Sequence, residues 1–130
     1  PDRQDGALPG RYRAHPEELI VPYIVPQENG ARGGTSWLTL EFDDGVRLII
    51  GGNKQFSFSV SPYSESELWN ARHFDELPPV AEALSEGAWL YLDICQRGVG
   101  TATCGPDTLP SYRIFPGEYT ATFSFSRQAL

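Results

Sequence analysis

Carboxylates are the residues of this sequence whose spacing could support acid–base chemistry. Asp43 and Asp44 are adjacent, and Glu65 and Glu67 are separated by one residue. Enzymes that cleave glycosidic bonds place one carboxylate as nucleophile or base and a second as acid, on opposite sides of the bond. The Asp-Asp-Gly sequence at 43–45 is, however, typical of a hairpin turn. The two glutamates suit the first turn of a helix, where the helix dipole favours negative charge. We therefore interpret both pairs as structural.

Histidine and cysteine are too dispersed along the chain to predict a metal centre. His15 and His73 lie far in sequence from Cys95 and Cys104, and there is no Cys-x-x-Cys. Zinc sites need their ligands in closely spaced groups, so we predict no metal site. We expect free thiols in a reducing cytoplasm, although a bridge between the two cysteines is geometrically possible. His73 could act as a base, but a partly buried structural histidine is the simpler interpretation.

Residues 97–110 (RGVGTATCGPDTLP) form the most unusual stretch. It is rich in small residues, and its only charges are Arg97 and Asp107. Small side chains let a backbone approach another surface closely. The loop is therefore either presented to a ligand or neighbouring domain, or it merely connects two strands.

The three tryptophans also have two interpretations. Together with the six tyrosines they could form a stacking platform for a sugar. Trp37 and Trp89 lie in or beside strand patterns, which favours a core or an interface. Trp69 lies on the expected helix and fits either interpretation.

Length and charge limit the class of protein. The chain has 130 residues, 40% of them hydrophobic, and a formal net charge of -7. This length fits one domain or part of one. The negative charge argues against nucleic acid and anionic membranes as partners, because both are negatively charged and bind clusters of Lys and Arg. No apolar run approaches the ~18–20 residues of a membrane span. Methionine is absent even at position 1, which raises the question whether residue 1 is a natural start.

Two regions of different pattern follow one another. Residues 1–35 are rich in Pro and Gly, and we expect an extended, irregular segment with a short strand at 23–25. Residues 36–130 alternate with a period of two, as antiparallel strands do, with Ser57, Ser59 and Ser61 on a wet face. The expected strands are 38–42, 46–50, 56–60, 89–94, 112–115 and 119–125, with turns at 43–45, 51–53 and 116–117.

One helix interrupts the strands. Ser64 and Glu67 have the spacing of a capping box, and Leu68 and Ala71 form an apolar stripe. The prolines at 78–79 are expected to stop regular structure. These elements predict an all-β fold, an antiparallel β-sandwich with one short helix.

Several stretches, in the same order, resemble the C-terminal sandwich domain of the large beta-galactosidases of glycoside hydrolase family 2. The resemblance covers nearly the whole chain. Its elements are Pro1-Asp2-Arg3, residues 23–30 (YIVPQENG), Phe56 and Phe58 followed by Tyr63-Ser64 and Glu67-Leu68, His73 with Glu76-Leu77, and Asp93 through Gly98-Val99-Gly100 to residues 105–110 and Tyr112. It implies the terminal part of a larger, supersandwich-like fold of the galactose-mutarotase-like kind, with an artificial or processed start before Pro1.

The resemblance also implies a function. The parent enzyme would be a cytoplasmic, oligomeric, retaining hydrolase of terminal beta-D-galactosides such as lactose. In that family the two catalytic glutamates lie in a central barrel domain upstream, and no glutamate of this chain matches either motif. We therefore predict no catalytic residue here and an inactive isolated segment. The parent's Mg²⁺ and Na⁺ would also belong mainly to the barrel, so that this segment binds no cofactor. Its partners would be the barrel domain, the galactoside and further copies of the enzyme.

In that family, the loop before Gly-Pro reaches over the mouth of the active site and commonly carries a Trp that stacks on the sugar. The matching position here is Cys104, in a loop that is one residue shorter than the common form. A thiol is too small to stack, which predicts a wider mouth and an altered preference for the leaving group or acceptor. The predicted substrate-binding residues of the active-site rim are Thr101, Ala102, Thr103 and Cys104.

Two other functions remain open from the sequence. The chain could be a stand-alone, non-catalytic carbohydrate-binding or assembly module. It could also be the small subunit of a galactosidase divided over two chains. An independent module should fold alone as a monomer and bind galactosides, whereas a segment with unpaired strand edges should favour aggregation or a partner.

Overall fold

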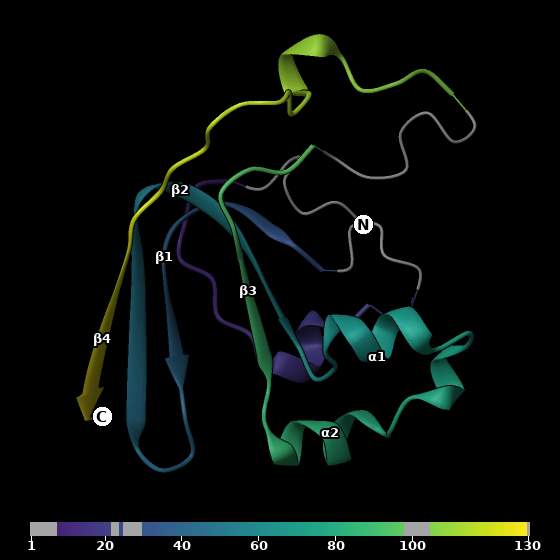
Figure 1. The fold of residues 1–130 in the computed structure, drawn as a ribbon. Helices are drawn as coiled ribbons and strands as arrows, with labels where there is room; N and C mark the ends of the chain where they lie inside the picture. Colours follow the sequence, from purple (N-terminus) through teal and green to yellow (C-terminus); the bar gives the residue numbers. More distant parts are fainter. Residues whose placement is uncertain (1–7, 22–23, 25–29, 98–104, 130) are drawn as a thin grey trace.

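The computed structural model describes residues 8–21, 24, 30–97 and 105–129. One antiparallel sheet carries the fold, with short helices beside one end of it and residues 105–115 arching over the other end (Figure 1). The all-β, antiparallel prediction is confirmed, and a single sheet of this kind is consistent with one layer of a sandwich. The elements are η1 (Pro16–Leu19), β1 (Arg32–Glu41), β2 (Val46–Ser61), α1 (Glu65–Asn70), η2 (Phe74–Glu76), α2 (Val80–Glu86), β3 (Trp89–Asp93), η3 (Pro110–Tyr112) and β4 (Phe123–Ala129), where η marks a 3-10 helix.

Strand β2 organises the sheet because it pairs with all three other strands. β1 runs antiparallel along one edge of β2 over most of its length. On the other edge, β4 pairs with the first half of β2, from Val46 to Gly52, and β3 pairs with the second half, from Ser57 to Ser61. The two halves of β2 therefore belong to two differently composed parts of one sheet.

The hairpin between β1 and β2 follows the sequence prediction. Phe42 N–H donates to the Val46 carbonyl at 2.8 Å, and Gly45 adopts a φ of 78°. This left-handed conformation is one that glycine adopts without strain. The Asp44 carboxylate accepts a hydrogen bond from Val46 N–H at 3.0 Å. Asp44 therefore has a structural role in the turn.

The predicted turn at 51–53 is wrong, because β2 continues through it. The strand bends there instead, and Figure 1 shows both β1 and β2 curving over at this point. In the register, the short step from Thr35 to Trp37 on β1 corresponds to the longer step from Phe56 to Gly51 on β2, so β2 bulges. The glycines permit the bulge, but pairing with β1 and β4 keeps the residues in the strand.

The core lies where the two parts of the sheet meet. Ile50 is fully buried, and Leu38 and Phe56 are buried beside it. Phe56 packs edge-to-face against Phe123, with ring centroids 5.2 Å apart. Partly buried side chains extend this cluster, namely Leu40, Leu48, Phe58, Leu90, Leu92 and Phe123.

The face of β2 that carries Ser57, Ser59 and Ser61 is less exposed to solvent than predicted. Ser57 is only 9% exposed. Ser59 and Ser61 are half-buried. Ser57, Ser59 and Ser61 lie on the part of β2 that pairs with β3, and Ser61 Oγ is hydrogen-bonded to the backbone of the buried Tyr63.

Helix α1 begins as its sequence predicts. Ser64 Oγ accepts a hydrogen bond from Glu67 N–H at 3.2 Å, and Ser64 N–H donates to the Glu67 carboxylate at 2.7 Å. Glu65 N–H donates to the Tyr91 hydroxyl at 2.8 Å, which joins the helix to β3. The predicted apolar stripe is half-buried. Leu68 shares a small apolar pocket with η1.

Helix α2 was not expected from the sequence. Pro79, predicted to stop regular structure, is the N-cap of α2. A proline suits a helix start, because the first N–H groups of a helix have no partner within it. None of the helices described is long and apolar enough to cross a membrane.

The chain after the loop differs from prediction. The expected strand at 112–115 is wrong: Tyr112 and Arg113 donate their N–H groups back to Leu109 and Pro110, and the described residues between β3 and β4 form no strand. The expected strand at 119–125 begins only at Phe123. The described part of the chain therefore has four strands, where about six were predicted.

The N-terminal region also differs in detail. β1 begins at Arg32, inside the segment predicted to be irregular, and η1 forms at Pro16–Leu19. Of the expected strand at 23–25, Ile24 is described and is not in a strand, while its two neighbours lie outside the described residues.

Candidate functional site

The loop singled out by the sequence lies between two ends that the structure describes. Arg97 precedes it and Gly105 follows it. Neither end belongs to a strand, since β3 ends at Asp93 and β4 begins at Phe123. The predicted rim residues, Thr101, Ala102, Thr103 and Cys104, lie outside the described residues. The geometry of the loop's two ends is therefore what the structure shows of this site.

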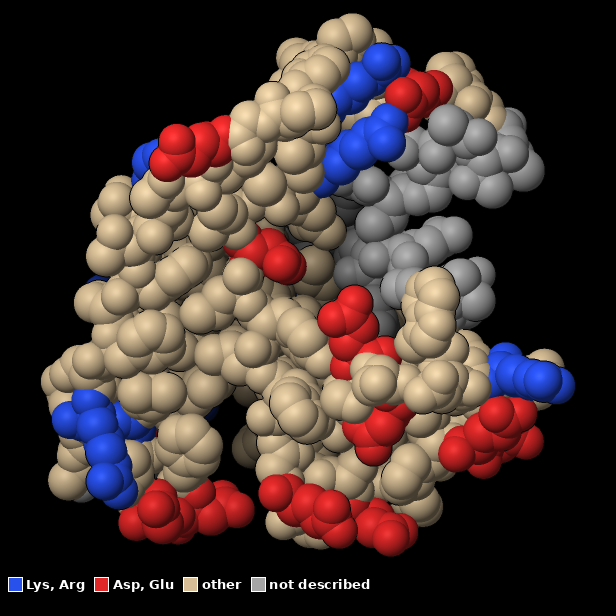
Figure 2. Space-filling model, in the orientation of Figure 1, with Lys and Arg blue, Asp and Glu red and all other residues tan. Residues whose placement is uncertain are grey.

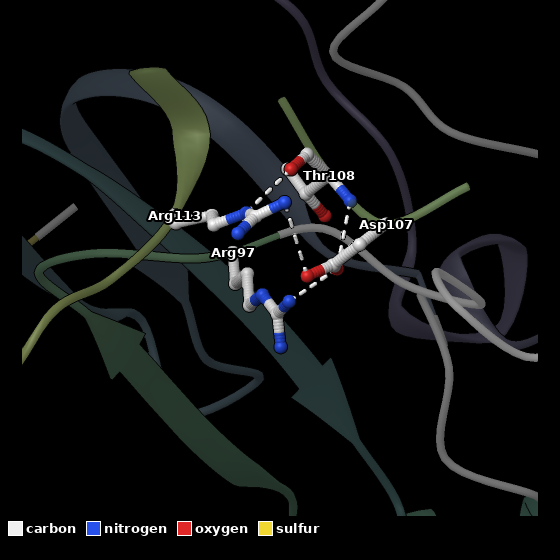
Figure 3. Close-up of polar contacts among 4 residues, drawn as sticks. All are labelled: Arg97, Asp107, Thr108 and Arg113. Atoms are coloured by element: carbon white, nitrogen blue, oxygen red, sulfur yellow. Dashed lines mark hydrogen bonds and ion pairs between the residues drawn. The ribbon is translucent and has the colours of Figure 1, made fainter. Parts of the chain in front are cut away.

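Two arginines form ion pairs with the carboxylate of Asp107, and these contacts join the two ends of the loop (Figure 3). Arg97 forms an ion pair through Nη2 with Asp107 Oδ1. Arg113 Nη2 lies 3.3 Å from Asp107 Oδ2, and Arg113 Nε donates to the Thr108 carbonyl at 2.7 Å. Thr108 N–H donates to Asp107 Oδ1 at 2.8 Å. We call Arg97, Asp107 and Arg113 the Arg–Asp–Arg clamp.

Local turns bring the third member of the clamp into place. η3 reverses the direction of the chain after Leu109, because Tyr112 N–H donates to the Leu109 carbonyl at 2.9 Å. Arg113 N–H continues the turn by donating to Pro110 at 3.2 Å. Arg113 is thereby directed back toward Asp107, as Figure 3 shows.

The clamp is half-exposed and carries a net positive charge. The side chains of Arg97, Asp107 and Arg113 are 45%, 30% and 35% exposed. Two guanidinium groups against one carboxylate leave one positive charge in excess. Thr108 Oγ1, next to the clamp, is buried and has no hydrogen-bond partner among the residues described. Buried hydroxyl groups normally have such a partner.

Sequence reasoning found two members of the clamp and missed the third. Arg97 and Asp107 stood out as the only charges of the loop. Arg113 lay in a stretch wrongly expected to be a strand, so its return toward the loop was not foreseen. The signal that could have found it is a second arginine shortly after a lone aspartate, separated from it by five residues that include Pro110.

The carboxylate pairs prove to be structural, as predicted. Asp44 lies in the hairpin turn, and Glu65 and Glu67 lie in the first turn of α1. Hydrogen bonds from the side chain and backbone of Ser64 hold the pKa of Glu67 below its ordinary value. A lowered pKa favours the charged form, as capping requires.

The remaining candidate residues do not gather into a site. His73 is exposed, contrary to the partly buried role expected for it, and is the N-cap of η2. Cys95 is exposed and free. Asp93, at the end of β3, has its pKa raised by desolvation. Among residues 8–21, 24, 30–97 and 105–129, no three His, Cys, Asp or Glu side chains could jointly hold a metal ion.

Large apolar side chains cover much of the surface. Trp37 is 52% exposed and Trp89 54% exposed, so neither belongs to the core. The Arg11 guanidinium lies 5.7 Å from the Trp37 ring centre. Figure 2 shows one face of the sheet almost free of charged side chains. The other exposed large apolar residues are Leu8, Tyr12, Phe42, Trp69, Ile94, Leu109, Tyr112, Ile114, Phe115, Tyr119 and Phe125.

Known proteins resemble the chain along almost its entire length. A family model described as "Beta galactosidase small chain" matches residues 1–126. A beta-galactosidase of Leuconostoc mesenteroides is 34% identical over 97% of this chain, and one of Actinobacillus pleuropneumoniae is 30% identical over 94%. A beta-galactosidase of Vibrio cholerae is 39% identical over 77% of this chain. The chain spans only about 11% of the length of the first two relatives and 9% of the third. This chain therefore belongs to the beta galactosidase small chain family.

Proposed function

We propose that this chain is a segment of a retaining beta-galactosidase that hydrolyses terminal beta-D-galactosides such as lactose. The segment contributes a loop to the rim of the active site and a packing surface, while the catalytic glutamates belong to the remainder of the enzyme. The names of the relatives and the small share of their length that it matches support this proposal.

The exposed apolar surface is the observation that carries the proposal. The described side chains form a small core around Ile50, while three Trp, three Phe and three Tyr remain largely exposed. Exposed aromatic and aliphatic side chains in this number favour a surface that another molecule or domain covers. A segment that completes a larger protein needs apolar surface on many elements, whereas a stand-alone sugar-binding module needs only a local aromatic platform.

The clamp supports the proposed role of the loop. It holds together two chain ends that no strand pairing joins, at the positions that flank the predicted rim residues. A loop that borders a substrate has to leave the fold at a defined place, because small misplacements near a reacting centre have large kinetic effects.

Further features follow from the same proposal. Mg²⁺ and Na⁺ are bound by the remainder of the enzyme, which is cytoplasmic and a homo-oligomer. Cys104 and its neighbours face the aglycone, with Cys104 where relatives of the family carry a stacking tryptophan.

A segment exchange tests the proposal. In the Leuconostoc mesenteroides beta-galactosidase, the matching region is replaced by this chain, and hydrolysis of lactose and an aryl beta-galactoside is measured. We expect an active, full-size chimera, no activity in a variant that lacks the region, and none in the isolated chain. Proton NMR should detect beta-galactose as the first product, because the proposed mechanism retains configuration.

Two results would contradict the proposal. One is a folded chimera without activity. The other is an isolated chain that is monomeric and binds galactosides by itself, which would favour the stand-alone module. Adding the isolated chain to the deletion variant separates the remaining alternative, since rescue in trans would indicate a small subunit of a two-chain enzyme.

A further inference from the structure

We infer that Asp107 is a positioning residue, which fixes where the two ends of the loop 98–104 leave the fold. This inference rests on the proposed function only for its consequence in catalysis. The positioning itself rests on the geometry of the Arg–Asp–Arg clamp.

The first step is that one carboxylate joins both ends. Arg97 lies immediately before the loop, and Asp107 lies just after it. Asp107 Oδ1 forms an ion pair with Arg97 Nη2, and Asp107 Oδ2 lies 3.3 Å from Arg113 Nη2. Each carboxylate oxygen therefore contacts a different arginine. Because Asp107 is the shared partner, its loss removes both ion pairs, whereas the loss of either arginine leaves one.

The second step concerns the second arginine. Arg113 Nε donates to the Thr108 carbonyl at 2.7 Å while Nη2 faces Asp107. The planar guanidinium thus orients the carboxylate relative to the backbone that follows it. Asp107 also accepts Thr108 N–H at 2.8 Å, which limits the rotation of its side chain. Arg113 and Thr108 N–H therefore hold the carboxylate in one orientation, in which it also contacts Arg97.

The third step is energetic. The three side chains are partly exposed, and ion pairs of that kind add little to global stability. Closing a loop has an entropic cost that other contacts must offset. Loss of the clamp should therefore widen the range of positions of the loop ends without unfolding the protein, which separates a positioning role from a structural one.

The chain offers a matched control. Glu41 at the end of β1 also faces two arginines, with Arg13 Nη2 at 2.7 Å and Arg47 Nη2 at 3.5 Å. Glu41→Gln removes the same charge from the same kind of cluster, but at the β1–β2 hairpin. Any effect of Asp107→Asn that Glu41→Gln shares is not an effect on the loop.

The experiment uses the complete enzyme that carries this segment. Iodoacetamide labelling of Cys104, measured by peptide mass spectrometry and divided by labelling of Cys95, reports on the loop. KM for lactose divided by KM for an aryl galactoside reports on the rim. For Asp107→Asn we expect each ratio to change by about two- to fivefold, the effect of losing exposed ion pairs. Glu41→Gln should change neither ratio, and the charge-retaining Asp107→Glu should lie between wild type and Asp107→Asn.

The outcomes distinguish the inference from the proposed function. An unchanged labelling ratio in Asp107→Asn would overturn the positioning role, whatever the kinetics. An equal change in Glu41→Gln would overturn it as well. A changed labelling ratio with an unchanged KM ratio would uphold the positioning role and contradict the proposed place of the loop at the rim.

Discussion

The ring of Phe56 lies over Gly52, in the space where any other residue would carry its Cβ. An ideal Cβ at Gly52 would lie 2.9 Å from Cδ1 of Phe56 and 2.6 Å from the Lys54 carbonyl oxygen. Phe56 is 3% exposed and packs against Phe123. The bend of β2 and the packing of the core therefore depend on the same glycine.

Gly52→Ala should destabilise the chain by about 1–3 kcal/mol, the usual effect of overpacking a core. The added methyl group meets backbone as well as the ring, so a change of one rotamer cannot relieve the clash. Urea unfolding of the chain measures the effect. Gly51→Ala is the matched control, because its Cβ would meet only Ser124 Oγ at 3.3 Å. Equal stability of the two variants would contradict this account of the bend.

Gly51 and Gly52 also show where prediction from local sequence fails. The sequence at 43–45 and the capping box at Ser64 predicted their structures correctly, because short-range hydrogen bonds decide both. The sequence at 51–53 has equally strong turn signals, yet pairing with two distant strands keeps it in β2. Long-range pairing of this kind cannot be inferred from the pattern of one segment.

Glu67→Gln should remove a pH-dependent contribution to stability. Hydrogen bonds from Ser64 lower the pKa of Glu67, so the folded state favours its carboxylate. That contribution is present above the unfolded pKa and is lost as the pH falls through the lowered, folded value. The difference in unfolding midpoint between wild type and Glu67→Gln should therefore be largest near neutral pH and vanish in acid.

A suitable control for this effect is Glu82→Gln. Glu82 lies in the first turn of α2, whose N-cap makes no side-chain hydrogen bond. The substitution there removes the same charge without removing a capping hydrogen bond. A Glu67→Gln difference that persisted unchanged in acid would show that the charge of Glu67 is not the source of its contribution to stability.

Phe125→Gln should lower the stability of the complete enzyme more than the stability of the isolated chain. Phe125 lies on β4, is 60% exposed, and is paired with the fully buried Ile50. As a surface change it should alter the stability of the isolated chain by no more than about 0.5 kcal/mol. In the complete enzyme, the proposed packing surface would lose an apolar contact, which lowers the temperature of half-inactivation. Gln128→Ala on the same strand serves as control, and equal effects of the two variants would argue against burial of Phe125.

The candidate site was predictable only in part, for a related physical reason. Arg97 and Asp107 were visible as isolated charges in a neutral loop. Their meeting with Arg113 depends on η3, whose local hydrogen bonds replaced the strand expected at 112–115. The prediction of that strand did not take account of the missing N–H groups of Pro110 and Pro116, which flank it. The resemblance to a family, rather than any residue pattern, supplied the interpretation of the loop.

Cys104→Trp in the complete enzyme should shift its preference among galactosides. An aromatic ring can stack on a sugar or an aryl group, whereas a thiol is too small to do so. If residue 104 borders the aglycone, the substitution should change KM for lactose and for an aryl galactoside by different factors. Cys95→Trp is the matched control, because Cys95 precedes the clamp and is exposed. Unchanged kinetics for both substrates in Cys104→Trp would show that residue 104 does not border the aglycone. A parallel change in Cys95→Trp would show that the added aromatic bulk, rather than its position, is responsible.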